Sequence, residues 1–180
     1  MSINKSNPAT IVKKSLAISA IALLSLTSIS TAIAAPATSL GTFKLWTAWK
    51  NNDANGVICY VSSQPQNSMP ANVNRDPIHF MVIHRKGLGT KNEVQTLVGY
   101  PLDTNASISV NVDGKNYAMV GEGSAAWLAS AKDEAAFVDG MKRGSEMIVK
   151  GKSKRGTNTT DTYSLSGVTA AIAQIDKACK

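Results

Sequence analysis

The residues Ile108–Val120, ISVNVDGKNYAMV, give the clearest indication of the fold class of this 180-residue chain. Apolar and polar residues alternate over Ile108–Val112 and again over Asn116–Val120, which is the period of a strand with one buried face. Asp113-Gly114 stands between them, and this dipeptide favours the positive φ angles of a two-residue hairpin turn. The stretch therefore predicts two antiparallel strands joined by a tight turn.

Segments of the same kind precede this hairpin. Phe43–Trp49 and Val57–Ser63 are rich in β-branched and aromatic residues, and the polar residues Asn51–Gly56 between them predict a hairpin loop. Two more strands are predicted over Ile78–Arg85 and Glu93–Val98. The amino-terminal half is therefore expected to be a series of antiparallel strands.

After the hairpin predicted over Ile108–Val120, the spacing of apolar residues changes from that of strands to that of a helix. Ser130–Arg143 has helical spacing, with Ser130 as the predicted N-cap, and Ser166–Cys179 predicts a second helix. Between these helices, Glu146–Ser153 and Thr159–Leu165 predict strands. We expect a mainly β fold: an antiparallel β-sandwich or barrel-like sheet of about eight strands with two short helices, one of them C-terminal.

The amino terminus has the features of an export signal. Lys5, Lys13 and Lys14 precede a short apolar stretch over Leu16–Ile29, and Ala32-Ile33-Ala34 follows with the small residues that signal peptidase requires. The apolar stretch is shorter than the roughly 20 residues of a membrane-spanning helix. We therefore predict that residues 1–34 are a cleaved signal peptide.

Residues 35–180 are then expected to be a single domain, periplasmic or associated with the outer surface, without a transmembrane segment. Removing the three signal lysines lowers the formal charge from +7 to +4. The start, Ala35–Leu40, is expected to be flexible, and Gln64–Asp76 to be one long polar loop.

Two cysteines, Cys59 and Cys179, lie near opposite ends of the mature chain. In an oxidising compartment, an even count this low allows one intramolecular pairing. We predict a Cys59–Cys179 disulfide, and the alternative is two free thiols.

No motif with a catalytic or metal-binding pattern is found in the sequence. His79 and His84 are an odd number of residues apart in one predicted strand, so their side chains point to opposite faces. Gly151-Lys152-Ser153 lacks the earlier glycine of a phosphate-binding loop, and Ser124 lacks the second glycine of a nucleophile elbow. We expect no enzyme activity, no cofactor and no metal.

A basic run is the strongest candidate for a binding surface. Lys150, Lys152 and Lys154 share one face if their strand is regular, and Arg155 follows them. Such a surface suits an anionic partner, whereas a nucleic acid is not expected because no aromatic residues alternate with these cations. The alternative is that the lysines protect an exposed strand from aggregation.

Two tryptophans are predicted to have different surroundings. Trp46 and Trp49 are three residues apart in one strand and so lie on opposite faces. One is expected in the core, and the other is free to cover an edge or bind a partner.

Several separated motifs are shared with one family of proteins. They are the strand ending in Cys59-Tyr60, Arg75-Asp76-Pro77, Gly99-Tyr100-Pro101, Ala126-Trp127, Lys150–Gly156, Asp161–Leu165 and Gly167–Cys179. With these motifs the chain resembles the invasion-associated locus B family, exported proteins of alphaproteobacteria named for a member implicated in entry into red blood cells. The resemblance covers nearly all of the mature chain and implies a β-sandwich-like fold.

These observations favour a non-enzymatic exported envelope or surface protein. We expect it to act by binding a host-surface or envelope component, such as an anionic lipid, a glycan or a protein. One alternative is a periplasmic envelope-maintenance factor that binds a small ligand or a protein. The other is a hydrolase whose site has no recognisable motif.

Overall fold

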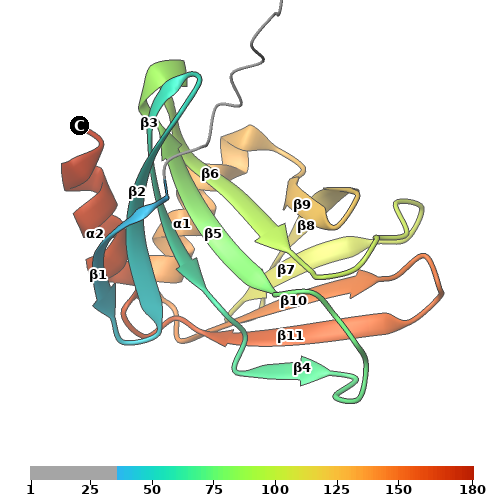
Figure 1. The fold of residues 1–180 in the computed structure, drawn as a ribbon. Helices are drawn as coiled ribbons and strands as arrows, with labels where there is room; N and C mark the ends of the chain where they lie inside the picture. Colours follow the sequence, from blue (N-terminus) through green and yellow to red (C-terminus); the bar gives the residue numbers. More distant parts are fainter. Residues whose placement is uncertain (1–35) are drawn as a thin grey trace, which may run out of the picture. The chain divides into compact units, whose positions relative to one another are not determined.

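Eleven strands form one antiparallel sheet in the computed structural model, which describes residues 36–180 (Figure 1). Their order in the sheet is β1-β2-β3-β5-β6-β9-β8-β7-β10-β11-β4. The strands are β1 (Thr38–Phe43), β2 (Trp46–Asp53), β3 (Gly56–Ser63), β4 (Asn67–Met69), β5 (His79–Arg85), β6 (Thr90–Leu97), β7 (Ile108–Val112), β8 (Lys115–Glu122), β9 (Ala125–Leu128), β10 (Glu146–Lys152) and β11 (Asn158–Ser164).

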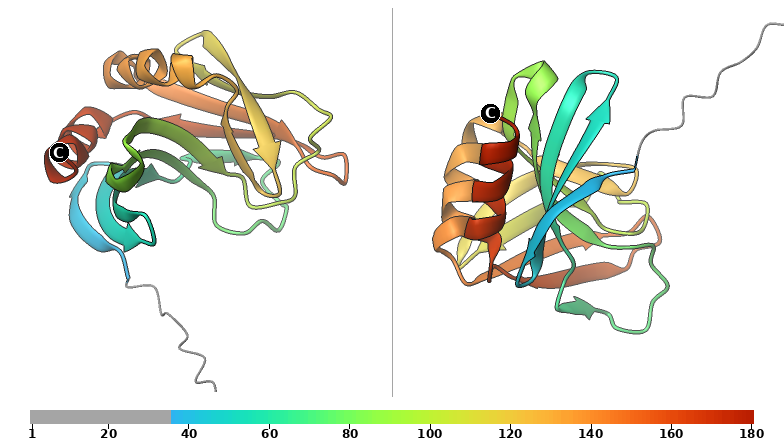
Figure 2. Two further views of the ribbon diagram at one scale, coloured as in Figure 1. Left: turned by 90° about the horizontal axis from the view of Figure 1, so that it is seen from above. Right: turned by 60° about the vertical axis from the view of Figure 1, so that its left-hand side comes forward.

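The sheet curves until its two halves face each other across the core (Figure 2). Phe80 of β5 contacts Tyr163 of β11 edge to face, with ring centroids 5.8 Å apart, although β6, β9, β8, β7 and β10 lie between these strands in the sheet. Trp46 of β2 is fully buried, and its indole N–H donates to the Ser164 carbonyl at 3.0 Å. The predicted antiparallel, barrel-like class is confirmed, and the central hairpin is β7–β8.

The structure has more strands than the eight expected. Lys44 and Leu45 form a turn that splits Phe43–Trp49 between β1 and β2, and Thr38–Leu40 belongs to β1 although a flexible start was predicted. β4 lies inside the predicted polar loop, and β9 is a short alanine-rich strand. These strands were not predicted because their own sequences have low β-propensity. They form because pairing with neighbouring strands stabilises them.

Two helices lie beside each other at one end of the curved sheet (Figure 2). α1 (Glu134–Arg143) buries Phe137, Val138 and Met141, and α2 (Val168–Ala178) packs against β1, β2 and β3. The short 3-10 turns η1 (Lys86–Leu88) and η2 (Ala131–Asp133) complete the described elements. The prediction of Ser130 as N-cap is wrong, because α1 starts only at Glu134, after η2, and Ser130 makes no capping hydrogen bond.

The predicted disulfide is present. Cys59 of β3 is bonded to Cys179 at the end of α2, with Cα atoms 6.0 Å apart and a separation of 120 positions in sequence. It holds the carboxyl-terminal helix against the sheet.

The predicted signal peptide, residues 1–34, lies outside the described residues and stays a prediction. Within residues 36–180, no helix is both long and apolar enough to span a membrane.

Candidate functional site

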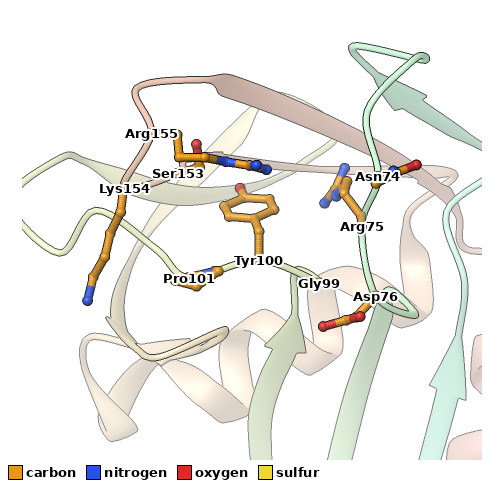
Figure 3. Close-up of a pocket in the computed structure, with 9 residues that line it drawn as sticks. All are labelled: Asn74, Arg75, Asp76, Gly99, Tyr100, Pro101, Ser153, Lys154 and Arg155. Carbon is orange, nitrogen blue, oxygen red and sulfur yellow. The ribbon is translucent and has the colours of Figure 1, made fainter.

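A pocket of about 480 Å³ lies where three loops meet beside the curved sheet (Figure 3). The loops precede β5, follow β6 and follow β10. We call it the Tyr100 pocket. The residues that line it are Asn74, Arg75, Asp76, Gly99, Tyr100, Pro101, Ser153, Lys154 and Arg155.

Arg75 forms the inner wall of the Tyr100 pocket, and its side chain is only 6% exposed. Nη1 and Nη2 donate to the two carboxylate oxygens of Asp161 at 2.7 and 2.6 Å. Nε and Nη2 also donate to the Val98 carbonyl at 2.9 and 2.7 Å. This two-point pairing holds the guanidinium in one orientation.

Asp161 supplies the matching charge from the inner face of β11 and is 1% exposed. An unpaired carboxylate in that position would be strongly unfavourable, because burial removes its hydration. The ion pair with Arg75 therefore ties the end of the polar loop to β11.

Tyr100 forms the floor of the pocket. Its ring lies 5.0 Å from the guanidinium carbon of Arg75, a cation–π contact, and its hydroxyl is 2.5 Å from Thr159 Oγ1. Burial raises the pKa of Tyr100 above its ordinary value, although the Thr159 hydrogen bond and the charge of Arg75 act in the opposite direction. The phenol is therefore neutral at physiological pH.

Gly99 allows the two loops to approach each other. Its φ is +74°, and a Cβ atom at this position would lie 2.2 Å from the Asp76 carbonyl oxygen. The Asp76 N–H donates to the Gly99 carbonyl at 2.9 Å. Glycine is required because a side chain would push Asp76 and the neighbouring Arg75 outwards.

Lys154 and Arg155 are exposed residues in the turn after β10. The turn is held to the pocket floor, because the Lys154 N–H donates to the Pro101 carbonyl at 3.0 Å. In Figure 3 the Arg155 side chain extends across Tyr100 towards Arg75. The Lys154 side chain also lines the pocket but points away from Tyr100 and Arg75. In the part of the chain that the structure describes, no carboxylate forms a salt bridge with either side chain.

The predicted basic face is divided by the structure. Lys150 and Lys152 lie on the outer face of β10, beside a separate hollow, and Lys152 Nζ is 3.9 Å from Asp103 Oδ2. Because β10 ends at Lys152, Lys154 and Arg155 belong to the turn. Only these last two residues line the Tyr100 pocket.

Reasoning from residue types missed Arg75, Tyr100 and Asp161 as site residues. They were nevertheless within the motifs that carried the family resemblance, and the structure brings those separate motifs to one place. Their presence in those motifs was therefore the one feature of the sequence that could have identified them as site residues.

The comparisons with known proteins agree with each other. A sequence model of the family described as "Invasion associated locus B (IalB) protein" matches residues 46–176, a range that includes every residue of the Tyr100 pocket. The crystal structure of invasion associated protein b from Bartonella henselae is similar in fold, with a TM-score of 0.54 and 14% identity over 79% of this chain and 99% of that one. Among curated proteins, none is significantly similar in sequence.

Proposed function

The chain belongs to the invasion associated locus B family, and from this premise we propose that it is an exported, non-enzymatic protein that binds a phosphate-bearing group at the Tyr100 pocket. The observation that carries the proposal is the Arg155 guanidinium, which extends over a rigid floor without an acidic partner in the described chain. Its planar fork of N–H donors suits the oxygens of a phosphate.

The inner groups of the pocket support binding because they are already hydrogen-bonded to one another. Arg75 is paired with Asp161, and the Tyr100 hydroxyl is paired with Thr159. Groups held in this way do not reorganise when a ligand arrives, which lowers the entropic cost of association. Arg155 and Lys154 are then the cations available to a ligand.

Export is supported by two independent features. A disulfide such as Cys59–Cys179 is typical of proteins outside the reducing cytoplasm. The predicted signal peptide accounts for how the chain reaches such a compartment.

The test compares two double variants on the β10–β11 hairpin. Lys154→Gln/Arg155→Gln removes the two exposed cations of the pocket, whereas Lys150→Gln/Lys152→Gln removes the same charge from the outer face of β10. The probes are glycerol 3-phosphate and vesicles of phosphatidylglycerol, with phosphatidylcholine vesicles as the neutral control. We expect the first variant to bind both anionic probes at least about tenfold more weakly and the second to change little.

Equal losses in the two variants would show a general attraction between charges and would contradict a pocket. Unchanged binding in both variants, or no binding by the unmodified protein, would also overturn the proposal. Retention of vesicle binding only, without glycerol 3-phosphate, would locate the contact outside the pocket.

The place of action needs its own experiment. Labelling intact cells with a membrane-impermeant amine reagent tests whether lysines such as Lys154 are reachable, with a known periplasmic protein as the lysis control. Labelling of intact cells supports binding to a host surface, such as that of an erythrocyte. Labelling only after the outer membrane is opened supports the periplasmic maintenance role instead.

A further inference from the structure

A second concave site lies on the outer face of the sheet, away from the residues of the Tyr100 pocket. This groove of about 360 Å³ is formed by the β1–β2 turn, the outer faces of β2 and β3, and the chain between β3 and β4. We call it the Trp49 groove. Residues that line it include Thr42, Thr47, Trp49, Ser62, Gln64 and His79.

Trp49 provides an aromatic surface that the core does not use. Trp46, on the opposite face of β2, is fully buried, whereas Trp49 is half-buried and lines the groove. Trp49 lies opposite Tyr60 of β3, with ring centroids 6.3 Å apart and ring planes 20° from parallel. This neighbour holds the indole in a fixed orientation on the outer face.

Hydroxyl groups surround this aromatic surface. The Trp49 indole N–H donates to Ser62 Oγ at 3.0 Å, so the Ser62 hydroxyl hydrogen remains available to a ligand. Thr42 Oγ1 and Thr47 Oγ1 lie 3.0 Å apart at the groove's edge. The groove therefore combines one fixed apolar surface with several short hydrogen-bonding side chains.

Two longer side chains add free donors and acceptors. Gln64 and His79 line the groove, and within residues 36–180 neither side chain takes part in a hydrogen bond, although both backbone carbonyls accept one. An amide and an imidazole each offer both a donor and an acceptor.

Charge distinguishes this groove from the Tyr100 pocket. Lys44 is the only Lys, Arg, Asp or Glu among the described residues that line it, whereas Arg75, Asp76, Lys154 and Arg155 line the Tyr100 pocket. The two sites share no lining residue. An uncharged ligand with many hydroxyl groups fits this lining better than an anion does.

We propose that the Trp49 groove binds a neutral saccharide, with the C–H face of a pyranose ring against Trp49 and the sugar hydroxyls bonded to Ser62, Thr47 and Gln64. The electron-rich face of an aromatic ring attracts the weakly positive C–H groups of a sugar. Each sugar hydroxyl is both a donor and an acceptor, like the side chains that surround the indole. The groove's volume lies within the range of small-ligand sites, about 300 to 1,000 Å³.

The experiment uses chitotetraose, maltotetraose and cellotetraose as probes, measured by saturation-transfer NMR and by tryptophan fluorescence on the full mature chain. We expect at least one probe to bind with millimolar or better affinity. Trp49→Ala is expected to weaken that binding by about three- to tenfold, the loss of one aromatic contact. Trp49→Phe is expected to retain part of it.

Trp127→Ala is the matched control, because Trp127 is also a half-buried tryptophan but lies on β9 and does not line the groove. Gln64→Ala/His79→Ala tests the same groove without removing an aromatic ring, in case Trp49→Ala does not fold. Arg155→Gln is expected to leave saccharide binding unchanged, which separates this proposal from that for the Tyr100 pocket.

Three results would overturn the proposal. The first is no saturation transfer to any of the three probes. The second is equal weakening by Trp127→Ala and Trp49→Ala. The third is unchanged binding in both Trp49→Ala and Gln64→Ala/His79→Ala.

Discussion

Arg75 and Asp161 are 86 residues apart in sequence and form a two-point ion pair inside the protein. Arg75 lies within the loop between β4 and β5, and Asp161 lies in the middle of β11. The pair therefore joins two halves of the curved sheet at the inner wall of the Tyr100 pocket. Stability and site geometry depend on the same contact.

Replacing one partner of this pair is expected to be strongly destabilising. Asp161→Asn leaves the guanidinium buried without a counter-charge, so we expect a loss of about 3 to 5 kcal/mol in the free energy of unfolding, measured by urea denaturation. The double variant Arg75→Met/Asp161→Leu is expected to lose less than Asp161→Asn alone, because no charge remains buried. A loss below about 1 kcal/mol for Asp161→Asn would contradict this account.

Gly99→Ala is expected to disturb the pocket beyond its effect on backbone conformation. A Cβ at Gly99 would lie 2.2 Å from the Asp76 carbonyl oxygen, whereas one at Gly89, where φ is +65°, meets nothing within 4 Å. Gly89→Ala therefore measures the cost of positive φ alone, about 1 kcal/mol. We expect a larger stability loss and weaker glycerol 3-phosphate binding for Gly99→Ala only, and equal effects in the two variants would refute the steric explanation.

Removing the disulfide is expected to reduce stability without changing the fold. Cys59 and Cys179 close a loop of 120 residues, for which loop-closure entropy gives about 4 to 5 kcal/mol as an upper figure. Cys59→Ser/Cys179→Ser is expected to unfold at lower urea concentration while its far-ultraviolet circular dichroism is retained. An unchanged urea midpoint would show that the loop is already restricted in the unfolded state.

Asp176 makes stability depend on pH. Burial alone would raise the pKa of Asp176, but hydrogen bonds from Lys91 and His84, together with their charges, outweigh it and lower this pKa. Lys91 Nζ lies 2.8 Å and His84 Nε2 3.1 Å from Asp176 Oδ1. A lowered folded-state pKa stabilises the fold above the ordinary carboxyl pKa of about 4, and this stability is lost as pH falls through the lowered value.

Lys91→Met tests this relationship. We expect the variant to be less stable than the unmodified protein at about pH 7 and the difference to shrink as pH falls below the ordinary carboxyl pKa of about 4, because Asp176 then becomes protonated. Lys86→Met is the control, because Lys86 is exposed and forms no salt bridge with the described residues. A difference that is constant with pH would mean that Lys91 contributes through packing alone.

Features that depend only on neighbouring residues could be predicted from the sequence. Alternation and Asp113-Gly114 predicted the β7–β8 hairpin, because strand period and turn conformation are local properties. The same period predicted that Trp46 and Trp49 lie on opposite faces of their strand, as do His79 and His84, and the structure shows that Trp46 and His84 are the buried members. Local signals are sufficient for such decisions because each involves residues a few positions apart.

Contacts between residues that are distant in sequence depend on the complete fold and could not be predicted in this way. Nothing in the local pattern of Arg75, Tyr100 or Asp161 relates them, because their contact depends on the pairing of β4 with β11 and on the curvature of the whole sheet. The same curvature leaves Arg155 over the pocket and Lys150 outside it, although only five positions separate these residues. Side chains that are close in sequence point in different directions where a strand ends in a turn. Side chains that are far apart in sequence come together where strands pair. The residues of the Tyr100 pocket could therefore be identified as one site only from the folded structure.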